Sequence, residues 1–213
     1  MPGRQRRLAR PAAGLVLVLG LGFAGSNTRA EAGFVPLDAA GQAVAPGSED
    51  WSCSLDRSTG LVWEVKTLDG SVRDRRWTYT PYDSNPATNG GYVGFRDTAS
   101  GKCVRGEMPG GSCNTEAYVE HINGLDLCGY DDWRLPTAAE LTHAAPQTTI
   151  EPPRTGSPML PNIAEGWYWT GVTRVGVTAF SRVVLLPPAA RPAFYDGSYM
   201  VVLVRGQEAA GPR

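Results

Sequence analysis

Cys113–Leu141, CNTEAYVEHINGLDLCGYDDWRLPTAAEL, packs two cysteines, two helix-capping sequences and a Tyr-Asp-Asp-Trp-Arg cluster into one short stretch. Such a density of specified backbone features is typical of a structural signature rather than of a loose surface loop. Its first half predicts a helix that Asn114 or Thr115 caps and Gly124 ends. The apolar side of this helix recurs at i, i+4 and i+7, at Tyr118, Ile122 and Leu125.

The second half of the stretch predicts a short extended piece and then a second helix. Pro136 follows the extended residues. Thr137 and Glu140 form the capping box of the helix, which Pro146 stops. The residues expected to form the structural signature of the domain are Asp132, Trp133, Arg134, Pro136, Thr137 and Glu140.

Asp131 and Asp132 look like a carboxylate pair for acid–base chemistry or for a metal. Neighbouring residues in a turn or strand point apart, however, so a shared proton or metal is not expected. The preferred interpretation is an aspartate that caps the turn or pairs with Arg134, with Trp133 in the core.

The four cysteines, Cys53, Cys103, Cys113 and Cys128, indicate two disulfides, because none has the C-x-x-C spacing of a zinc site. Four cysteines allow three connectivities, and the sequence alone does not choose among them. The glycine-rich loop 107–111 folds back easily. This favours Cys103–Cys113, with Cys53–Cys128 as a long-range link.

Residues 1–30 have the three parts of a secretory signal peptide. A basic start containing Arg6-Arg7 is followed by an uncharged run over 11–25 and by small residues before Ala30. The run is short and glycine-rich for a membrane span, although an uncleaved anchor is the alternative. We therefore expect a periplasmic or secreted protein, with no stable membrane insertion after signal cleavage.

Removal of this signal leaves an acidic chain. The full sequence has 20 basic and 21 acidic residues, and residues 1–30 hold five of the basic ones and no acidic one. The mature chain therefore has 15 against 21, a net charge of −6. This balance argues against a nucleic-acid partner, and about 183 residues suit one domain with a sizeable core.

The mature chain is expected to be one α+β domain over 51–206. A poorly ordered lead-in over 31–50 precedes it, and a loose tail over 207–213 follows it. A strand over 61–66 is expected to bury its odd-numbered residues and to expose Glu64 and Lys66. Long turn-rich loops are expected over 69–112, and further strands over 167–170, 178–186 and 199–205.

Several motifs carry a family resemblance. They are Trp51-Ser-Cys53, Thr59-Gly60-Leu61, Cys113-Asn-Thr-Glu-Ala-Tyr118, Leu127-Cys128-Gly-Tyr-Asp-Asp-Trp-Arg-Leu-Pro-Thr137, Tyr168-Trp169 and Val202-Leu203-Val204-Arg205-Gly206. With them the chain resembles the C-terminal domain family of the Legionella collagen-like protein. The resemblance implies a C-type-lectin-like fold, in which the first and last strands meet and two helices flank a small, twisted antiparallel sheet.

The resemblance also implies an exported domain, as is typical of the family. Some members of the family are adhesins that bind sulfated glycans. The collagen-like repeat of the type protein is absent, so a trimer built on such a stalk is not implied. The lectin-type calcium motif places an acid or amide before Pro-Asn, whereas Met159-Leu160 precedes Pro161-Asn162 here. Calcium-dependent sugar binding is therefore not expected, and no cofactor is expected.

Two groups of residues are candidates for a ligand surface. Basic residues cluster across the tyrosine-rich loops and could bind sulfate or carboxylate, although a solvated face balanced by nearby aspartates is preferred because the chain is acidic. Aromatic residues around 167–169 could stack on a sugar, although core packing is preferred. The candidates are Arg73, Arg76 and Arg96, with Arg75, Lys102 and Arg105 beside them, and Trp167, Trp169, Arg182, Phe194 and Tyr195.

These patterns predict a non-catalytic binding or adhesion domain whose ligand is a glycan or a protein. The alternatives are an enzyme of the formylglycine-generating oxidase type and a structural module of a cell-surface assembly. The motif with the reactive cysteine pair of that oxidase is absent, as is the G-x-S-x-G sequence of hydrolases. His121 and His143, the only histidines, lack the further ligands of a metal site.

Overall fold

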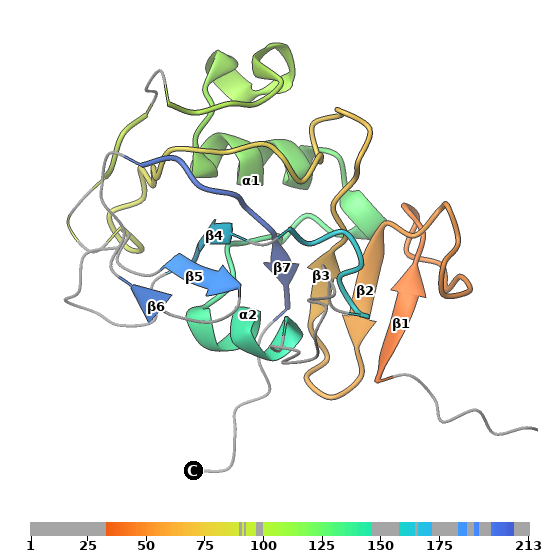
Figure 1. The fold of residues 1–213 in the computed structure, drawn as a ribbon. Coiled ribbons are helices and arrows are strands. Elements are labelled where there is room, and N and C mark those ends of the chain that lie inside the picture. The colour runs from red at the N-terminus through yellow and green to blue at the C-terminus, as the bar shows by residue number, and fades with distance from the viewer. Residues whose placement is uncertain are drawn as a thin grey trace, which may run out of the picture. The chain divides into compact units, whose positions relative to one another are not determined.

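The structure, a computed structural model, describes residues 33–89, 91, 93–96, 100–145, 158–164, 166–171, 183–186, 190–191 and 197–206. All of them lie in the compact unit Ala32–Arg213. The strands are β1 (Phe34–Leu37), β2 (Cys53–Asp56), β3 (Val62–Glu64), β4 (Gly166–Trp169), β5 (Val183–Leu186), β6 (Ala190–Arg191) and β7 (Val204–Arg205). The helices are α1 (Thr115–Gly124) and α2 (Ala138–Ala144), with the 3-10 turns η1 (Arg105–Glu107), η2 (Pro109–Gly111) and η3 (Leu127–Gly129) (Figure 1).

The strands form two antiparallel sheets, in the orders β1-β2-β3-β7 and β4-β5-β6. β3 pairs with β7 through Val62 opposite Arg205 and Trp63 opposite Val204. The strand predicted over 61–66 thus meets the strand nearest the C-terminal end of the described chain. Small antiparallel sheets with two helices and two disulfides make an α+β fold, as predicted.

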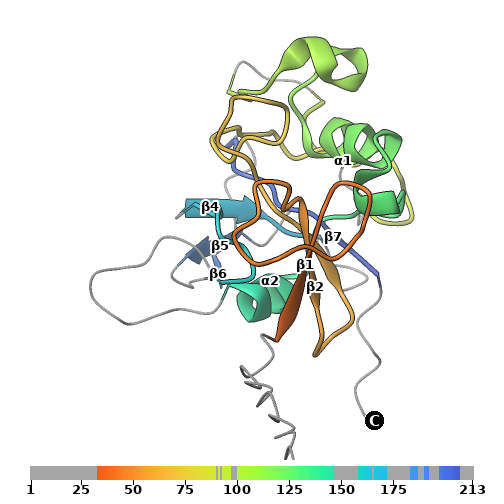
Figure 2. The same cartoon turned by 90° about the vertical axis from the view of Figure 1, so that its right-hand side faces the viewer.

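β3 is covered on both faces, which contradicts the prediction of a half-buried strand. Val62 packs in one apolar cluster with Tyr118 of α1, and Trp63 packs in a second cluster with Leu141 of α2. Glu64, which is expected to face solvent, is fully buried. The two helices therefore lie on opposite faces of this sheet (Figures 1 and 2).

The segment before Trp51 is also more ordered than the sequence predicts. β1 pairs with β2 over its whole length, from Phe34 opposite Asp56 to Leu37 opposite Cys53. The loop after β1 packs so closely on the signature that a Cβ at Gly41 would lie 2.5 Å from the carbonyl oxygen of Cys128. The expected lead-in therefore contributes an edge strand, because its few apolar residues pair and pack despite the Ala-, Gly- and Pro-rich composition around them.

Both helices of the signature begin where the sequence predicts. The Asn114 side chain caps α1 by accepting a hydrogen bond from the backbone N–H of Ala117, and Thr137 and Glu140 form a reciprocal capping box on α2. One detail is wrong. Leu125, expected on the buried side of the first helix, lies just beyond its end and is 52% exposed, because the chain turns away after Gly124.

Trp133 is buried and links the two halves of the signature. Its indole Nε1 donates to the carbonyls of Leu127 and Tyr130, 3.2 and 3.1 Å away. Asn123 of α1 exchanges two hydrogen bonds with the Trp133 backbone. These contacts confirm the predicted core position of Trp133.

The aspartate beside Trp133 has a different partner from the predicted one. Asp132 accepts hydrogen bonds from Nε and Nη2 of Arg205, at 2.8 and 2.9 Å, whereas Arg134 binds Glu140 and the carbonyl of Gly206. Arg134 also lies opposite Val204 in a backbone bridge. The arginine that follows the tryptophan therefore joins α2 to the C-terminal strand, a long-range pairing that sequence proximity does not reveal.

The two disulfides join the predicted pairs. Cys53–Cys128 connects β2 to η3 across 75 residues, and Cys103–Cys113 closes a loop of 10 residues. Cys128 adopts a left-handed backbone conformation with φ of 55°, which is uncommon for a residue with a side chain. None of the helices within the described residues is long and apolar enough to cross a membrane.

The capping box predicts how acid affects stability. Burial raises the pKa of the Glu140 carboxyl, but the hydrogen bonds from Arg134 and Thr137 outweigh burial and leave that pKa below its usual value. Glu140 therefore stabilises the fold above the unfolded-state pKa of about 4.3, and this stabilisation disappears as pH falls through the folded-state value. Glu140→Gln should lower the urea midpoint more at about pH 7 than at about pH 3. Equal losses at both pH values would contradict this role.

Candidate functional site

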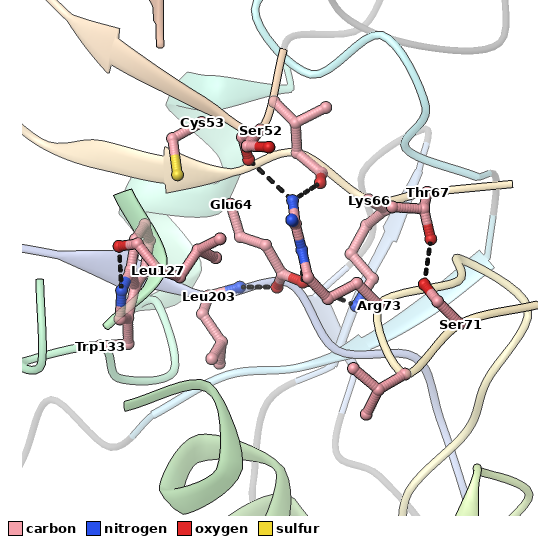
Figure 3. A network of polar contacts seen from close by, with 12 residues as sticks. Ser52, Cys53, Glu64, Lys66, Thr67, Ser71, Arg73, Leu127, Trp133 and Leu203 are labelled. Atoms are coloured by element: carbon pink, nitrogen blue, oxygen red, sulfur yellow. Dashed lines mark hydrogen bonds and ion pairs between the residues drawn. The ribbon is translucent and has the colours of Figure 1, made fainter. Parts of the chain in front are cut away.

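A cluster of buried ionisable side chains lies between β3, α1 and β7 (Figure 3). Glu64 is at its centre and is fully buried. Its carboxylate accepts hydrogen bonds from the Tyr118 hydroxyl and, at 3.1 Å, from the backbone N–H of Leu203. Burial raises the pKa of Tyr118 well above its usual range, and the charge of Glu64 adds to this effect. The phenol therefore stays protonated and donates.

Two cations compensate the buried carboxylate. Lys66 Nζ lies 3.0 Å from Glu64 Oε1 and 2.6 Å from the Tyr118 hydroxyl oxygen. Arg73 Nε lies 3.7 Å from the same carboxylate oxygen, and its Nη2 donates to the carbonyls of Ser52 and Val65. Burial lowers the pKa of Lys66, and the adjacent carboxylate opposes that effect.

This buried cluster has the composition of an active site but not its accessibility. Glu64 is 0% exposed, Lys66 4% and Tyr118 0%, so a substrate reaches none of them in the folded domain. Each charged group instead connects separate segments of chain. We therefore assign the cluster to the framework that holds the loop 67–76 and α1 against the sheet.

A serine, a histidine and an aspartate also meet on the surface between β2 and α2. His143 Nε2 lies 3.0 Å from Asp56 Oδ2 and 3.2 Å from Ser58 Oγ, and Ser58 Oγ donates to Asp56 Oδ1 at 2.7 Å. A hydrolytic triad needs the acid and the nucleophile on opposite nitrogens of the ring. Here both contact the same nitrogen, so the arrangement closes the turn after β2 and is not a triad.

The basic residues that the sequence groups together have different roles. Arg73 is turned inward, as described above. Arg76 is bound to Asp74 by two hydrogen bonds of 2.9 Å, and those bonds are the largest cause that holds the pKa of Asp74 well below its usual range. Arg105 donates to the carbonyls of Gly101 and Gly111 within its own loop. The single basic patch suggested by the sequence is therefore largely dispersed.

Arg75 is partly buried, which leaves Arg96 and Lys102. Both are exposed, and neither forms an ion pair with an acidic side chain in the described parts of the chain. Phe95, next to Arg96, is 36% exposed. We call Phe95, Arg96 and Lys102 the cationic loop surface.

The backbone that carries the cationic loop surface is held at both ends by one neighbouring segment, 78–80. Lys102 exchanges backbone hydrogen bonds of 2.8 and 2.9 Å with Thr78, and the Thr80 hydroxyl donates to the carbonyl of Phe95 at 3.0 Å. The Asn114 side chain donates to the carbonyl of Arg96. The described residues on either side of 97–99 are therefore both anchored to the segment 78–80.

The aromatic candidates separate into core and edge. Trp169 is 1% exposed and donates from Nε1 to the carbonyl of Tyr79, 2.7 Å away, so it is a core residue, as the preferred interpretation has it. Trp167 is half-buried, with its ring centroid 6.2 Å from that of Tyr199. Arg182, Phe194 and Tyr195 lie outside the described residues.

Lys102 and the aromatic pair of Tyr199 and Trp167 lie on different faces of the segment 78–80. Thr78 pairs with Lys102, and the next residue, Tyr79, pairs with Tyr199. Successive side chains of an extended chain point to opposite faces. Lys102 therefore shares the face of Thr78, whereas the Tyr199 ring and its neighbour Trp167 are on the other face.

Sequence reasoning missed the buried cluster around Glu64. A signal was present: Leu61-Val62-Trp63 is a run of three large apolar residues, which is typical of a strand buried on both faces rather than of an alternating one. Among the described residues no group of three or more potential ligands could hold a metal ion. Asn162 of the Pro-Asn pair is used structurally, since its amide donates to the carbonyl of Lys66 at 2.7 Å.

The chain thus combines two capped helices, two disulfides and a pairing of β3 with β7. No curated protein and no solved structure matches the chain. The family model of the Lcl C-terminal domain matches residues 52–205, a range that begins just before β2 and ends with β7. Because this match covers most of the sequence, the chain belongs to the Lcl C-terminal domain family.

Proposed function

We propose that this protein is an exported, non-catalytic binding domain whose ligand is an anionic glycan, held through the cationic loop surface. The observation that carries the proposal is the presence of two exposed cations, Arg96 and Lys102, without acidic partners in the described parts of an otherwise acidic chain. The guanidinium of Arg96 matches the planar geometry of sulfate or carboxylate. Phe95, next to Arg96, is 36% exposed, and an aromatic side chain of this kind suits contact with a sugar ring.

Export is supported by the disulfides and by the N-terminal sequence. All four cysteines are paired, and disulfides persist in oxidising compartments. The basic and apolar segments of residues 1–30 match a secretory signal. We place the protein in the periplasm or outside the cell.

The C-type-lectin-like fold belongs to the same proposal. Pairing of β3 with β7 supports it, as do the helices on opposite faces of the sheet and the long loops over 67–114. A non-catalytic role is supported by the closed cluster around Glu64 and by the disulfide bonding of every cysteine.

The test is binding of the purified domain to immobilised dextran sulfate, with unsulfated dextran as the control polymer. We expect binding to dextran sulfate alone, weakened by salt and unchanged by a calcium chelator. Arg96→Ala with Lys102→Ala should weaken binding by about tenfold or more, since a hydrogen bond to a charged group contributes about 1.5–3 kcal/mol. Biolayer interferometry measures both effects.

Arg76→Ala is the matched control for this experiment. It removes an arginine whose side chain is 66% exposed but whose charge is already paired with Asp74, so binding should stay close to that of the unaltered domain. Equal losses in Arg76→Ala and in the double variant would reveal a non-specific charge effect. Failure of the unaltered domain to bind dextran sulfate would overturn the glycan proposal in favour of a protein partner.

A further inference from the structure

The two disulfides differ in how they are shielded. Cys53 and Cys128 are 0% and 2% exposed. In the other disulfide Cys113 is fully buried, whereas Cys103 is only partly buried at the surface of its cluster. A thiolate attacks a disulfide sulfur that it can reach, so only Cys103 offers a target in the folded domain.

The bond between Cys103 and Cys113 closes a protruding loop. η1 and η2 lie within this loop and contain no buried residue; they are the light-green turns beyond α1 in both ribbon views (Figures 1 and 2). Cys53–Cys128 instead joins β2 to η3 within the apolar cluster that contains Val62 and Tyr118, which we call the main apolar cluster.

We propose that Cys103–Cys113 is a redox latch that a thiol or dithiol reductant opens in the folded protein, while Cys53–Cys128 stays closed. In the first step the reductant thiolate bonds to Cys103 Sγ, the Sγ–Sγ bond breaks, and its electron pair leaves on Cys113. In the second step another thiolate attacks the reductant sulfur of this mixed disulfide. It releases the Cys103 thiolate and leaves the reductant as its own disulfide, and both cysteines are then reduced.

The direction of opening follows from access to the two sulfurs. Cys113 is fully buried, whereas Cys103 is only partly buried. The reductant thiolate therefore bonds to Cys103, and Cys113 is the leaving sulfur.

Opening the latch should loosen the loop without unfolding the domain. Met108, between η1 and η2, is 5% exposed and belongs to the main apolar cluster. Arg105 still binds the carbonyls of Gly101 and Gly111, and Lys102 remains paired with Thr78. Reduction removes a covalent restraint next to Lys102. If the proposed function is correct, on which this last step rests, reduction also weakens ligand binding.

The latch is tested by treating the native protein with dithiothreitol, trapping thiols with iodoacetamide and locating the label by peptide mass spectrometry. We expect Cys103 and Cys113 to be labelled at least about tenfold faster than Cys53 and Cys128, with unchanged far-ultraviolet circular dichroism. Labelling of all four cysteines together, or of none before the dichroism is lost, would overturn the proposal.

A second measurement tests the direction of attack. Limiting glutathione followed by rapid alkylation should leave glutathione on Cys103 and the alkyl group on Cys113, and the reverse assignment would contradict the mechanism. The Cys103→Ser, Cys113→Ser variant should remain folded and show no labelling under the same native conditions. Labelling of Cys53 or Cys128 in that variant would overturn the proposal, because the buried bond would then not stay closed once the latch is open.

Binding to dextran sulfate is measured separately, for the oxidised and for the reduced protein. Reduction of the native protein should weaken binding by about tenfold, the lower end of what one charged hydrogen bond contributes. If the oxidised protein does not bind this polymer, the glycan proposal fails while the labelling result still decides the latch. Selective labelling with unchanged binding would confine the latch to the loop itself.

Discussion

Glu64→Ala is expected to lower the free energy of unfolding by about 3–5 kcal/mol, because it leaves two buried cations without their counter-charge. Lys66 is 4% exposed and Arg73 lies close to the same carboxylate. The change also removes acceptors for the Tyr118 hydroxyl and the Leu203 backbone N–H. Urea unfolding followed by tryptophan fluorescence measures the loss.

A double-mutant cycle separates the charge from the cavity that alanine creates. Glu64→Gln keeps the shape of the side chain and removes its charge. It should therefore lower the free energy of unfolding by most of the amount expected for Glu64→Ala. Adding Lys66→Met removes one of the unpaired cations and should recover at least about 1 kcal/mol of it, since a buried ion pair can be replaced by apolar groups at little cost. Additive losses in the two single variants would show that Glu64 and Lys66 are not coupled.

Cys53→Ala with Cys128→Ala is expected to destabilise the domain by about 4 kcal/mol, the second large effect. The bond spans 75 residues, and the entropy that a cross-link removes from the unfolded chain grows with the length of the loop it closes. Cys128 also adopts its left-handed backbone conformation next to this bond. The midpoint of thermal unfolding should fall accordingly.

The Cys103→Ala, Cys113→Ala variant is the matched comparison. Its loop has 10 residues, which in the same model contributes about 3 kcal/mol. Hydrogen bonds also hold the loop, from the Thr80 N–H to the carbonyl of Cys113 and between Thr78 and Lys102, the residue before Cys103. A larger loss in this variant than in Cys53→Ala with Cys128→Ala would contradict the view that the buried bond is the main covalent support of the fold.

Local sequence predicted the parts of the fold that depend on neighbouring residues. The caps at Asn114 and Thr137 were predictable because a helix end is satisfied by side chains within three positions. Cys103–Cys113 was predictable because a glycine-rich loop joins its ends. The strand β1 was not predictable, since the Ala-, Gly- and Pro-rich composition of 31–50 conceals its pairing with β2.

The candidate site was less predictable, because it depends on contacts between segments that the fold brings together. Arg73, Arg76 and Arg96 are close in sequence, yet one compensates a buried carboxylate, one pairs with Asp74 and one is exposed without an acidic partner in the described residues. Which cation remains available depends on the acidic group that the fold brings beside it. Periodicity carries no information about such contacts.

The sequence by itself determined the family, the two capped helices, the buried Trp133 and the α+β class, because each rests on a motif or on contacts within a few residues. Only the tertiary structure decided that both faces of β3 are covered and that Glu64, Lys66 and Arg73 form a closed cluster beneath them. It also decided that Asp132 pairs with Arg205 and Arg134 with Glu140. Asp132 meets Arg205 across 73 residues and Glu64 meets Tyr118 across 54 residues, and such partners come together only once the chain has folded.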